Sequence, residues 1–166
     1  ALSANTTAAN NTAIGRGALQ LNTTGAENTA VGKGALDANT TGAFGIAFGS
    51  GALGGNTTGA ANIGIGYNAL DSNTTADYNI GIGHAVDANT TANYNIGIGY
   101  NALTSEASGT SNVGIGHAAL EDSNGANYNT AVGYGSLRNN TTADNNTAFG
   151  YNSLTANTTG TENTSV

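Results

Sequence analysis

The amino-acid sequence predicts an all-β protein, a parallel β-solenoid (β-roll) whose coils are 17 residues long. Three observations indicate this fold class: a repeat of fixed length that runs from end to end, a glycine at the same place in every complete repeat, and apolar residues that alternate with small ones just before that glycine. Fixed-period self-similarity of this kind is typical of solenoids and other stacked arrays.

Each repeat is numbered here from position 1, which is asparagine in all repeats but one. The repeats begin at Asn11, Asn28, Gly45, Asn62, Asn79, Asn95, Asn112, Asn129, Asn146 and Asn163. The repeat that starts at Asn79 is one residue short after His84. Residues 1–166 therefore form a single β-roll array, with a partial coil at 1–10, nine coils at 11–162 and a partial coil at 163–166.

Positions 1 to 5 of each repeat are predicted to form a short strand. Positions 2 and 4 are apolar or β-branched, and side chains at i and i+2 lie on one face of a strand, so we expect this pair to face the core. The small residue at position 3 then leaves the opposite face flat, which would favour packing against further copies of the roll. The predicted core residues at position 4 are Ile14, Val31, Phe48, Ile65, Ile82, Ile98, Ile115, Val132 and Phe149.

The invariant glycine at position 5 indicates a corner, because glycine adopts backbone conformations that a Cβ hinders. After that corner we expect a second strand that carries an inward aliphatic residue at position 9. Those residues are Leu19, Leu36, Leu53, Leu70, Val86, Leu103, Leu120, Leu137 and Leu154. An Asn-Thr-Thr-Gly segment closes the coil as a turn. A helical repeat is excluded because glycine recurs and no 3.6-residue apolar stripe is present.

Stacked coils place equivalent residues above one another, about 4.8 Å apart. The asparagines at positions 1 and 12 are therefore expected to form ladders of amide hydrogen bonds between coils. A single coil buries few side chains, so we also expect an oligomer, most simply three rolls packed around one axis.

The composition limits the partners of the chain. Only 8% of the residues are charged, the formal net charge is −7, and the cations are Arg16, Lys33 and Arg138. Nucleic acid and anionic membrane surfaces are therefore not expected as partners. No apolar run is long enough to be inserted in a membrane, and the absence of cysteine excludes disulfides and thiolate metal sites. We expect an extracellular location, on a cell surface or a virion surface.

No pattern indicates an enzyme, a cofactor or a resident metal. His84 and His117 share position 6 with Tyr67, Tyr100, Tyr134 and Tyr151, so they are interpreted as polar corner residues; the alternative is a ring of imidazoles around an ion in a trimer. The tyrosine columns are expected to stiffen the stack, although aromatic ladders can also bind sugars. Asp37, Asp71, Asp87 and Glu121 are interpreted as solvated edge charges, since one carboxylate per coil is too few for calcium.

The recurring Asn-Thr-Thr triplets match the acceptor pattern for N-linked glycan, with O-linked glycan on threonine as a further option. The alternative is that asparagine is present as a turn former and the match is a by-product of the repeat. The possible glycosylation residues are Asn22, Thr24, Asn39, Thr41, Asn56, Thr58, Asn73, Thr75, Asn89, Thr91, Asn140, Thr142, Asn157 and Thr159.

The strand motif resembles a known family. The segments 12–15, 29–32 and 130–134 resemble the Ser-Val-Ala-Ile-Gly repeats of trimeric autotransporter adhesin heads. The segments 146–154 and 157–160 look like repeats of bacterial and phage tail-fibre-like proteins. This resemblance implies a left-handed parallel β-roll that trimerises on a surface-exposed or virion fibre, although the adhesin-head repeat is usually shorter.

We therefore expect a structural component of an extracellular fibre or filament, which adheres to surfaces through a repetitive trimeric β-roll. The alternative is a glycan- or ice-binding β-solenoid module. The expected partners are further copies of the chain, as a homotrimer, and an unknown surface receptor or glycan. Residues 1–7 match positions 8 to 14, and residues 163–166 match positions 1 to 4. Two interpretations of these ends stay open: a segment of a longer fibre, or protomers that stack head to tail into a filament.

Overall fold

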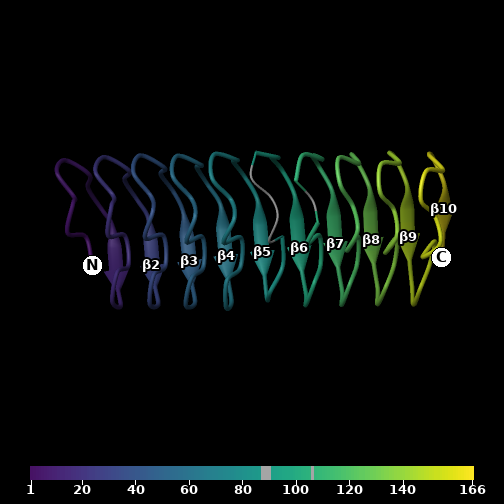
Figure 1. The fold of residues 1–166 in the computed structure, drawn as a ribbon, viewed down its shortest axis with the longest axis horizontal. Coiled ribbons are helices and arrows are strands. Elements are labelled where there is room, and N and C mark those ends of the chain that lie inside the picture. Colours follow the sequence, from purple (N-terminus) through teal and green to yellow (C-terminus); the bar gives the residue numbers. More distant parts are fainter. Residues whose placement is uncertain (87–90, 106) are drawn as a thin grey trace.

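The computed structural model describes residues 1–86, 91–105 and 107–166, and in these it shows a β-solenoid with one short strand per coil (Figure 1). The strands are β1 (Thr12–Ile14), β2 (Thr29–Val31), β3 (Ile46–Phe48), β4 (Ile63–Ile65), β5 (Ile80–Ile82), β6 (Ile96–Ile98), β7 (Val113–Ile115), β8 (Thr130–Val132), β9 (Thr147–Phe149) and β10 (Thr164–Ser165). They form one ten-stranded parallel sheet whose order follows the chain. The predicted fold class is confirmed.

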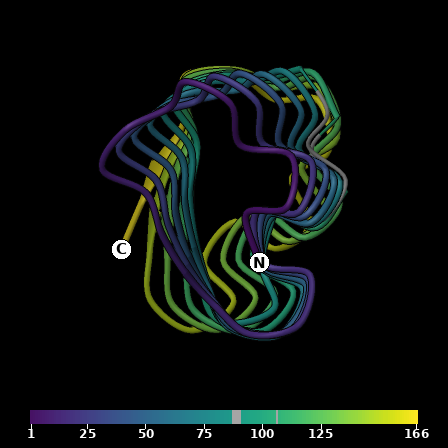
Figure 2. The same ribbon diagram turned by 90° about the vertical axis from the view of Figure 1, so that its left-hand side faces the viewer.

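The strands pair in register with the same position of the next coil. Thr12 pairs with Thr29, and Ile14 with Val31, which is one 17-residue coil further on. The short repeat does not break this register, because Ile80 still pairs with Ile96. Viewed along the stack, the coils form nested outlines with a gradual shift from one to the next (Figure 2). A missing residue after His84 is therefore accommodated outside the sheet.

The prediction of a second strand at position 9 is wrong. Leu19, Leu53 and their equivalents lie in turns and adopt the left-handed region, with φ of 48° and 52° at these two. The backbone is still paired between coils: Leu53 N–H donates to Ala69 O over 2.9 Å, and Val86 N–H donates to Ala102 O over 2.9 Å. The left-handed residue bends the chain sharply, so the leucine side chain enters the coil from a corner instead of from a flat strand.

The leucine column itself is the core, as predicted. Eight of the nine position-9 residues are fully buried, and Leu154 is partly buried in the last complete coil. The small residue at position 8, such as Ala52 or Ala102, is buried beside it. At about 25 cal/mol per Å² of apolar surface, this column is the main source of hydrophobic stabilisation in each coil.

The predicted orientation of the strand is wrong. Position 3 faces inward, and Ala30, Ala47 and Ala131 are fully buried there. Position 4 faces outward: Ile14 is 60% exposed and Phe48 is 57% exposed. All of the residues assigned to the core at this position are exposed or partly exposed, namely Ile14, Val31, Phe48, Ile65, Ile82, Ile98, Ile115, Val132 and Phe149.

The reason is the narrow interior of the coil. Alternation only requires positions 2 and 4 to share a face, and it does not say which face is buried. The leucines already fill the space opposite the strand: a Cβ added at Gly64 would lie 3.1 Å from Leu53 Cγ, and one at Gly81 would lie 2.9 Å from Leu70 Cγ. Only glycine or alanine fits at position 3, so the larger residues at positions 2 and 4 lie outside.

Two asparagine ladders join the coils, as predicted. At position 1, the backbone N–H of Asn79 donates to Asn62 Oδ1 over 2.8 Å. At position 12, Asn56 Nδ2 donates to Asn39 Oδ1 over 2.9 Å and to Gly59 O over 3.0 Å. Most of these side-chain amides are buried. Each is hydrogen-bonded to the neighbouring coil or to its own turn, as buried polar groups generally are.

Candidate functional site

The exposed apolar side chains gather on four neighbouring columns of the solenoid. Among the described residues, every large hydrophobic side chain that is exposed lies at position 17, 2, 4 or 6, with the exception of Leu21. These columns are the two outward columns of the sheet and the columns that flank it at either end of each strand. Exposed apolar surface that is concentrated in this way marks an interaction site more often than scattered exposure does.

The outward sheet face carries no charge. Its two columns contain only Thr, Ile, Val and Phe, and the central coils have the pattern Ile-Gly-Ile, as in β4, β5 and β6. Ten strands about 4.8 Å apart, each with three residues, make a strip of roughly 400 Å². An apolar patch of this size is within the range of the largest patch on a typical soluble monomer, and such patches are often functional.

A continuous aromatic stack follows position 6 from Tyr67 to Tyr151. Successive ring centroids are 6.3, 5.7, 5.5, 5.0 and 5.3 Å apart, through His84, Tyr100, His117 and Tyr134. A second contact, between Tyr78 and Tyr94, is 5.3 Å at position 17. Each internal ring of the long stack is covered on both faces by its neighbours. The internal rings therefore stiffen the stack and offer no free face to a sugar.

The two histidines are separated by a tyrosine. His84 contacts Tyr67 and Tyr100, whereas His117 contacts Tyr100 and Tyr134. In the described ranges, no group of three or more histidine, aspartate or glutamate side chains is close enough to hold a metal ion. An imidazole ring around an ion would need several copies of the chain, so it stays a prediction.

The Asn-Thr-Thr triplets separate into one buried and one exposed part. The amides of Asn22, Asn39, Asn56, Asn73 and Asn140 are buried and hydrogen-bonded, so an N-linked glycan does not fit there in the folded array. This corrects those five assignments. Asn157 is partly exposed, and Asn89 lies outside the described residues. The second threonine of the triplet is exposed at Thr24, Thr41, Thr58, Thr75, Thr91, Thr142 and Thr159, where O-linked glycan stays a prediction.

The first threonine of each triplet has a structural role. Thr40 Oγ1 donates to Thr57 O over 3.0 Å, and Thr23 Oγ1 donates to Thr40 O over the same distance. In the triplets of the described residues, the second threonine of each points to solvent, and these threonines form a single column. A flat Thr-x-Thr grid, which ice binding requires, is not formed by these triplets.

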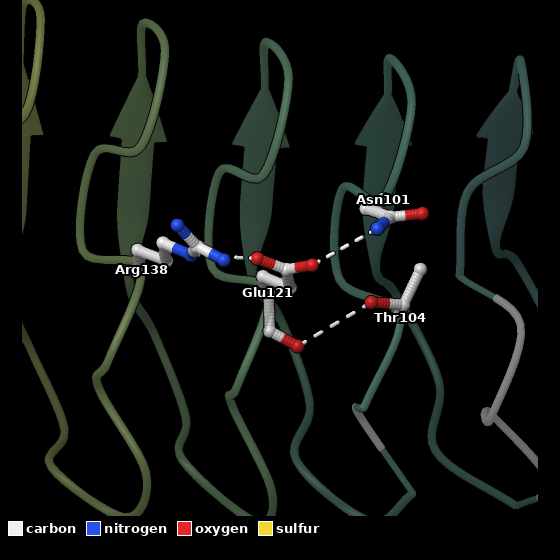
Figure 3. A network of polar contacts seen from close by, with 4 residues as sticks. All are labelled: Asn101, Thr104, Glu121 and Arg138. Carbon is white, nitrogen blue, oxygen red and sulfur yellow. Dashed lines mark hydrogen bonds and ion pairs between the residues drawn. The ribbon is translucent and has the colours of Figure 1, made fainter.

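The edge of the solenoid at positions 6 and 10 carries the three cations and four of the acidic residues. In coils six to eight these groups pair: Glu121 accepts hydrogen bonds from Arg138 Nε at 2.7 Å and from Asn101 Nδ2 at 2.9 Å (Figure 3). Thr104 Oγ1 is 3.5 Å from Glu121 O in the same network. Arg138 is half-exposed, so this ion pair contributes about 1 kcal/mol or less.

In coils one to four the same edge is hollow. A hollow of about 410 Å³ is lined by charged, polar and glycine residues, namely Lys33, Gly34, Asp37, Ser50, Gly51, Gly54, Gly55, Tyr67, Asn68 and Asp71. Asp37 and Asp71 are half-exposed there, as edge charges should be, and Asp87 lies outside the described residues. Sequence reasoning did not find this hollow, although the cluster of glycines at 49, 51, 54 and 55 was a visible signal.

Comparisons with protein-family models, with curated proteins and with solved structures found no match to this chain. Across the described parts of the chain, no helix is long and apolar enough to cross a membrane.

Proposed function

We propose that this chain is a structural, non-enzymatic module of an extracellular fibre or filament, in which rolls associate through their outward sheet faces. The observation that supports this proposal most is the uncharged apolar strip on β1–β10. Water contact along ten strands is unfavourable, and a second copy presents the same strip for burial. The strip itself holds no charged residue, so no charge on it opposes that contact.

Repetition sets the length of the proposed rod. Every complete coil repeats the same strand pairing, so each added coil extends the rod by about 4.8 Å. Multiple copies of any weak surface contact along such a rod add up through avidity. The proposal therefore needs no single deep binding site for adhesion.

Three rolls around one axis are the arrangement that we propose, in line with the resemblance to trimeric adhesin heads. In that arrangement the apolar strip of each roll faces the axis. The strip alone is smaller than the roughly 800 Å² per partner of a standard interface, so the flanking column at position 17 would add to it. Phe44, Tyr78 and Tyr128 are exposed on this column.

The proposal is tested by placing charge on the strip. The triple variant Ile65→Asp, Ile82→Asp and Ile98→Asp is expected to remain a folded β-solenoid, since these side chains face outward. It should sediment as a monomer, whereas the unmodified chain should sediment as a trimer or a larger assembly. Buried aspartates would repel one another and lose hydration in the interface. Sedimentation velocity and circular dichroism together measure both properties.

The matched control is Thr41→Asp, Thr58→Asp and Thr75→Asp, which adds the same three charges to an exposed column away from the strip. This control is expected to assemble like the unmodified chain. An unmodified chain that is monomeric at all concentrations, or a strip variant that assembles normally, would contradict the proposed lateral contact.

A further inference from the structure

The hollow edge of coils one to four is a continuous groove. The hollow of about 410 Å³ shares Lys33, Gly34 and Asp37 with a second one of about 240 Å³. That second hollow is also lined by Arg16 and Gln20. The groove follows the direction of stacking, with position 6 on one wall, position 10 on the other and position 7 on the floor. We call it the edge groove.

Glycines make the edge groove. The floor residue is glycine at Gly17, Gly34 and Gly51, and all three have positive φ, between 67° and 76°. A Cβ at Gly34 would meet nothing closer than Asp37 Oδ2, at 3.8 Å, so the space above it is open. In coils six to eight the same edge is bridged by Glu121 and Arg138 (Figure 3). The groove is therefore a local departure from the repeat.

Tyr67 ends the aromatic stack at the groove. One face of its ring contacts His84, at a centroid distance of 6.3 Å and an interplanar angle of 24°. The preceding coil has Ser50 at the same position, so the other face of the ring has no aromatic neighbour. Tyr67 lines the hollow and is 65% exposed. Tyr151 ends the long stack on its other side and lines neither hollow, so Tyr67 is the end of that stack that faces the groove.

The walls supply hydrogen-bonding groups of both kinds. Lys33 is a donor, Asp37 and Asp71 are acceptors, and Asn68 is both. Lys33 and the two aspartates make no ion pair in the described part of the chain, where the pair observed is that of Arg138 and Glu121. These groups are thus available to a ligand. Two carboxylates with one ammonium disfavour a polyanion in the larger hollow.

A peptide strand does not fit this edge as an added β-strand. The backbone at the groove is already bonded within the solenoid: Gly54 N–H donates to Gly51 O over 3.0 Å, and Gly55 N–H donates to Asp71 O over 2.7 Å. Strand addition needs a row of free N–H and C=O groups. The groove instead combines one free aromatic face with side-chain donors and acceptors around it.

We propose that the edge groove binds a short, uncharged oligosaccharide. One pyranose ring would lie with its C–H face on the free face of Tyr67, and its hydroxyls would bond to Asp71, Asn68 and Asp37. An aromatic face and a rim of polar groups match the apolar face and hydroxyl rim of a sugar ring. This site is distinct from the apolar strip, so it goes beyond the structural role proposed above.

The test measures saccharide binding by the full chain and by two variants. Cello-, chito-, manno- and galacto-oligosaccharides at millimolar concentration are the probes, and tyrosine fluorescence is the readout, since the chain has no tryptophan. Tyr67→Ser and Gly54→Gln are each expected to weaken binding at least tenfold. Both changes copy residues that the repeat already has at these positions, Ser50 and Gln20, so the fold should persist.

Tyr134→Ser and Thr104→Gln are the matched controls, because they make the same changes on the same columns outside the groove. Both should bind like the unmodified chain. Three results would overturn the proposal: no binding of any of the four saccharide types, binding that Gly54→Gln leaves unchanged, or preferential binding of a sulfated polymer that Lys33→Gln abolishes and Tyr67→Ser does not. Sedimentation of the variants separates these outcomes from loss of lateral assembly.

Discussion

Replacing Leu70 with alanine is expected to lower the free energy of unfolding by about 2 to 5 kcal/mol, the range for a large core residue that leaves a cavity. Leu70 is fully buried and packs against the next coil at Gly81. The cavity that the substitution leaves cannot easily collapse, because hydrogen bonds between the two coils fix their backbones. One of these bonds joins Leu70 N–H to Ala85 O at 3.3 Å.

Ile82→Ala is the control for that experiment. It removes a similar volume from the outward face of β5, where the side chain is only partly buried, so its effect on the isolated roll should be well below that of Leu70→Ala. Urea unfolding followed by circular dichroism compares the two. An equal or larger loss for Ile82→Ala in monomeric protein would contradict the orientation of the strand. In a stacked array the loss of stability should appear as unfolding of the affected coils at a lower urea concentration.

Replacing Gly66 with alanine is expected to be at least as damaging, because two effects add. The backbone at Gly66 has φ of +130°, a conformation that L residues rarely adopt. The added Cβ would also overlap the carbonyl of Gly83 in the next coil. Relief of that overlap requires the two coils to move apart, which weakens the strand pairing of β4 and β5. The thermal midpoint should fall by several degrees or more.

Gly150→Ala separates these two effects. Gly150 has a similar φ, +121°, but an added Cβ there has no neighbour within 4 Å. Its free energy of unfolding should fall by the conformational cost alone, about 1 to 3 kcal/mol. A difference close to zero between the two variants would mean that contact between the corner glycines does not limit the stacking distance.

The sequence was sufficient to predict the period, the stacking and the asparagine ladders, because each depends only on equivalent residues recurring. It also placed Leu53 and its equivalents inside correctly, since a large aliphatic residue occurs there in every complete coil. It did not predict that these leucines adopt left-handed backbone, which is unusual for a residue with a large side chain.

The strand orientation could not be predicted from alternation alone. The pattern Ile-Gly-Ile says that the isoleucines share a face, and burial of the larger residues is the usual choice. The choice is reversed here because the leucine of the preceding coil occupies the narrow interior, as the 3.1 Å approach of Leu53 Cγ to a Cβ at Gly64 shows. The edge groove was missed for a different reason: it depends on small substitutions within one regular coil, where glycine stands at positions 10 and 11 as Gly54 and Gly55.

The burial of the Asn-Thr-Thr asparagines also follows from packing between coils. A single triplet has the form of an exposed glycan acceptor, but stacking places Asn56 directly over Asn39, and the amides then bond to one another at 2.9 Å. A residue that looks like an exposed turn former in one repeat thus becomes part of a buried ladder once the coils are stacked.

Cross-sections of the purified protein by cryo-electron microscopy test the account most directly. We predict rolls whose ten-stranded sheets are turned toward a shared axis, with isoleucine and phenylalanine columns in contact across it and the leucines enclosed within each roll. Two results would contradict it. One is a single roll whose sheet is exposed to solvent, and the other is a set of rolls that contact one another along the threonine column or the charged edge.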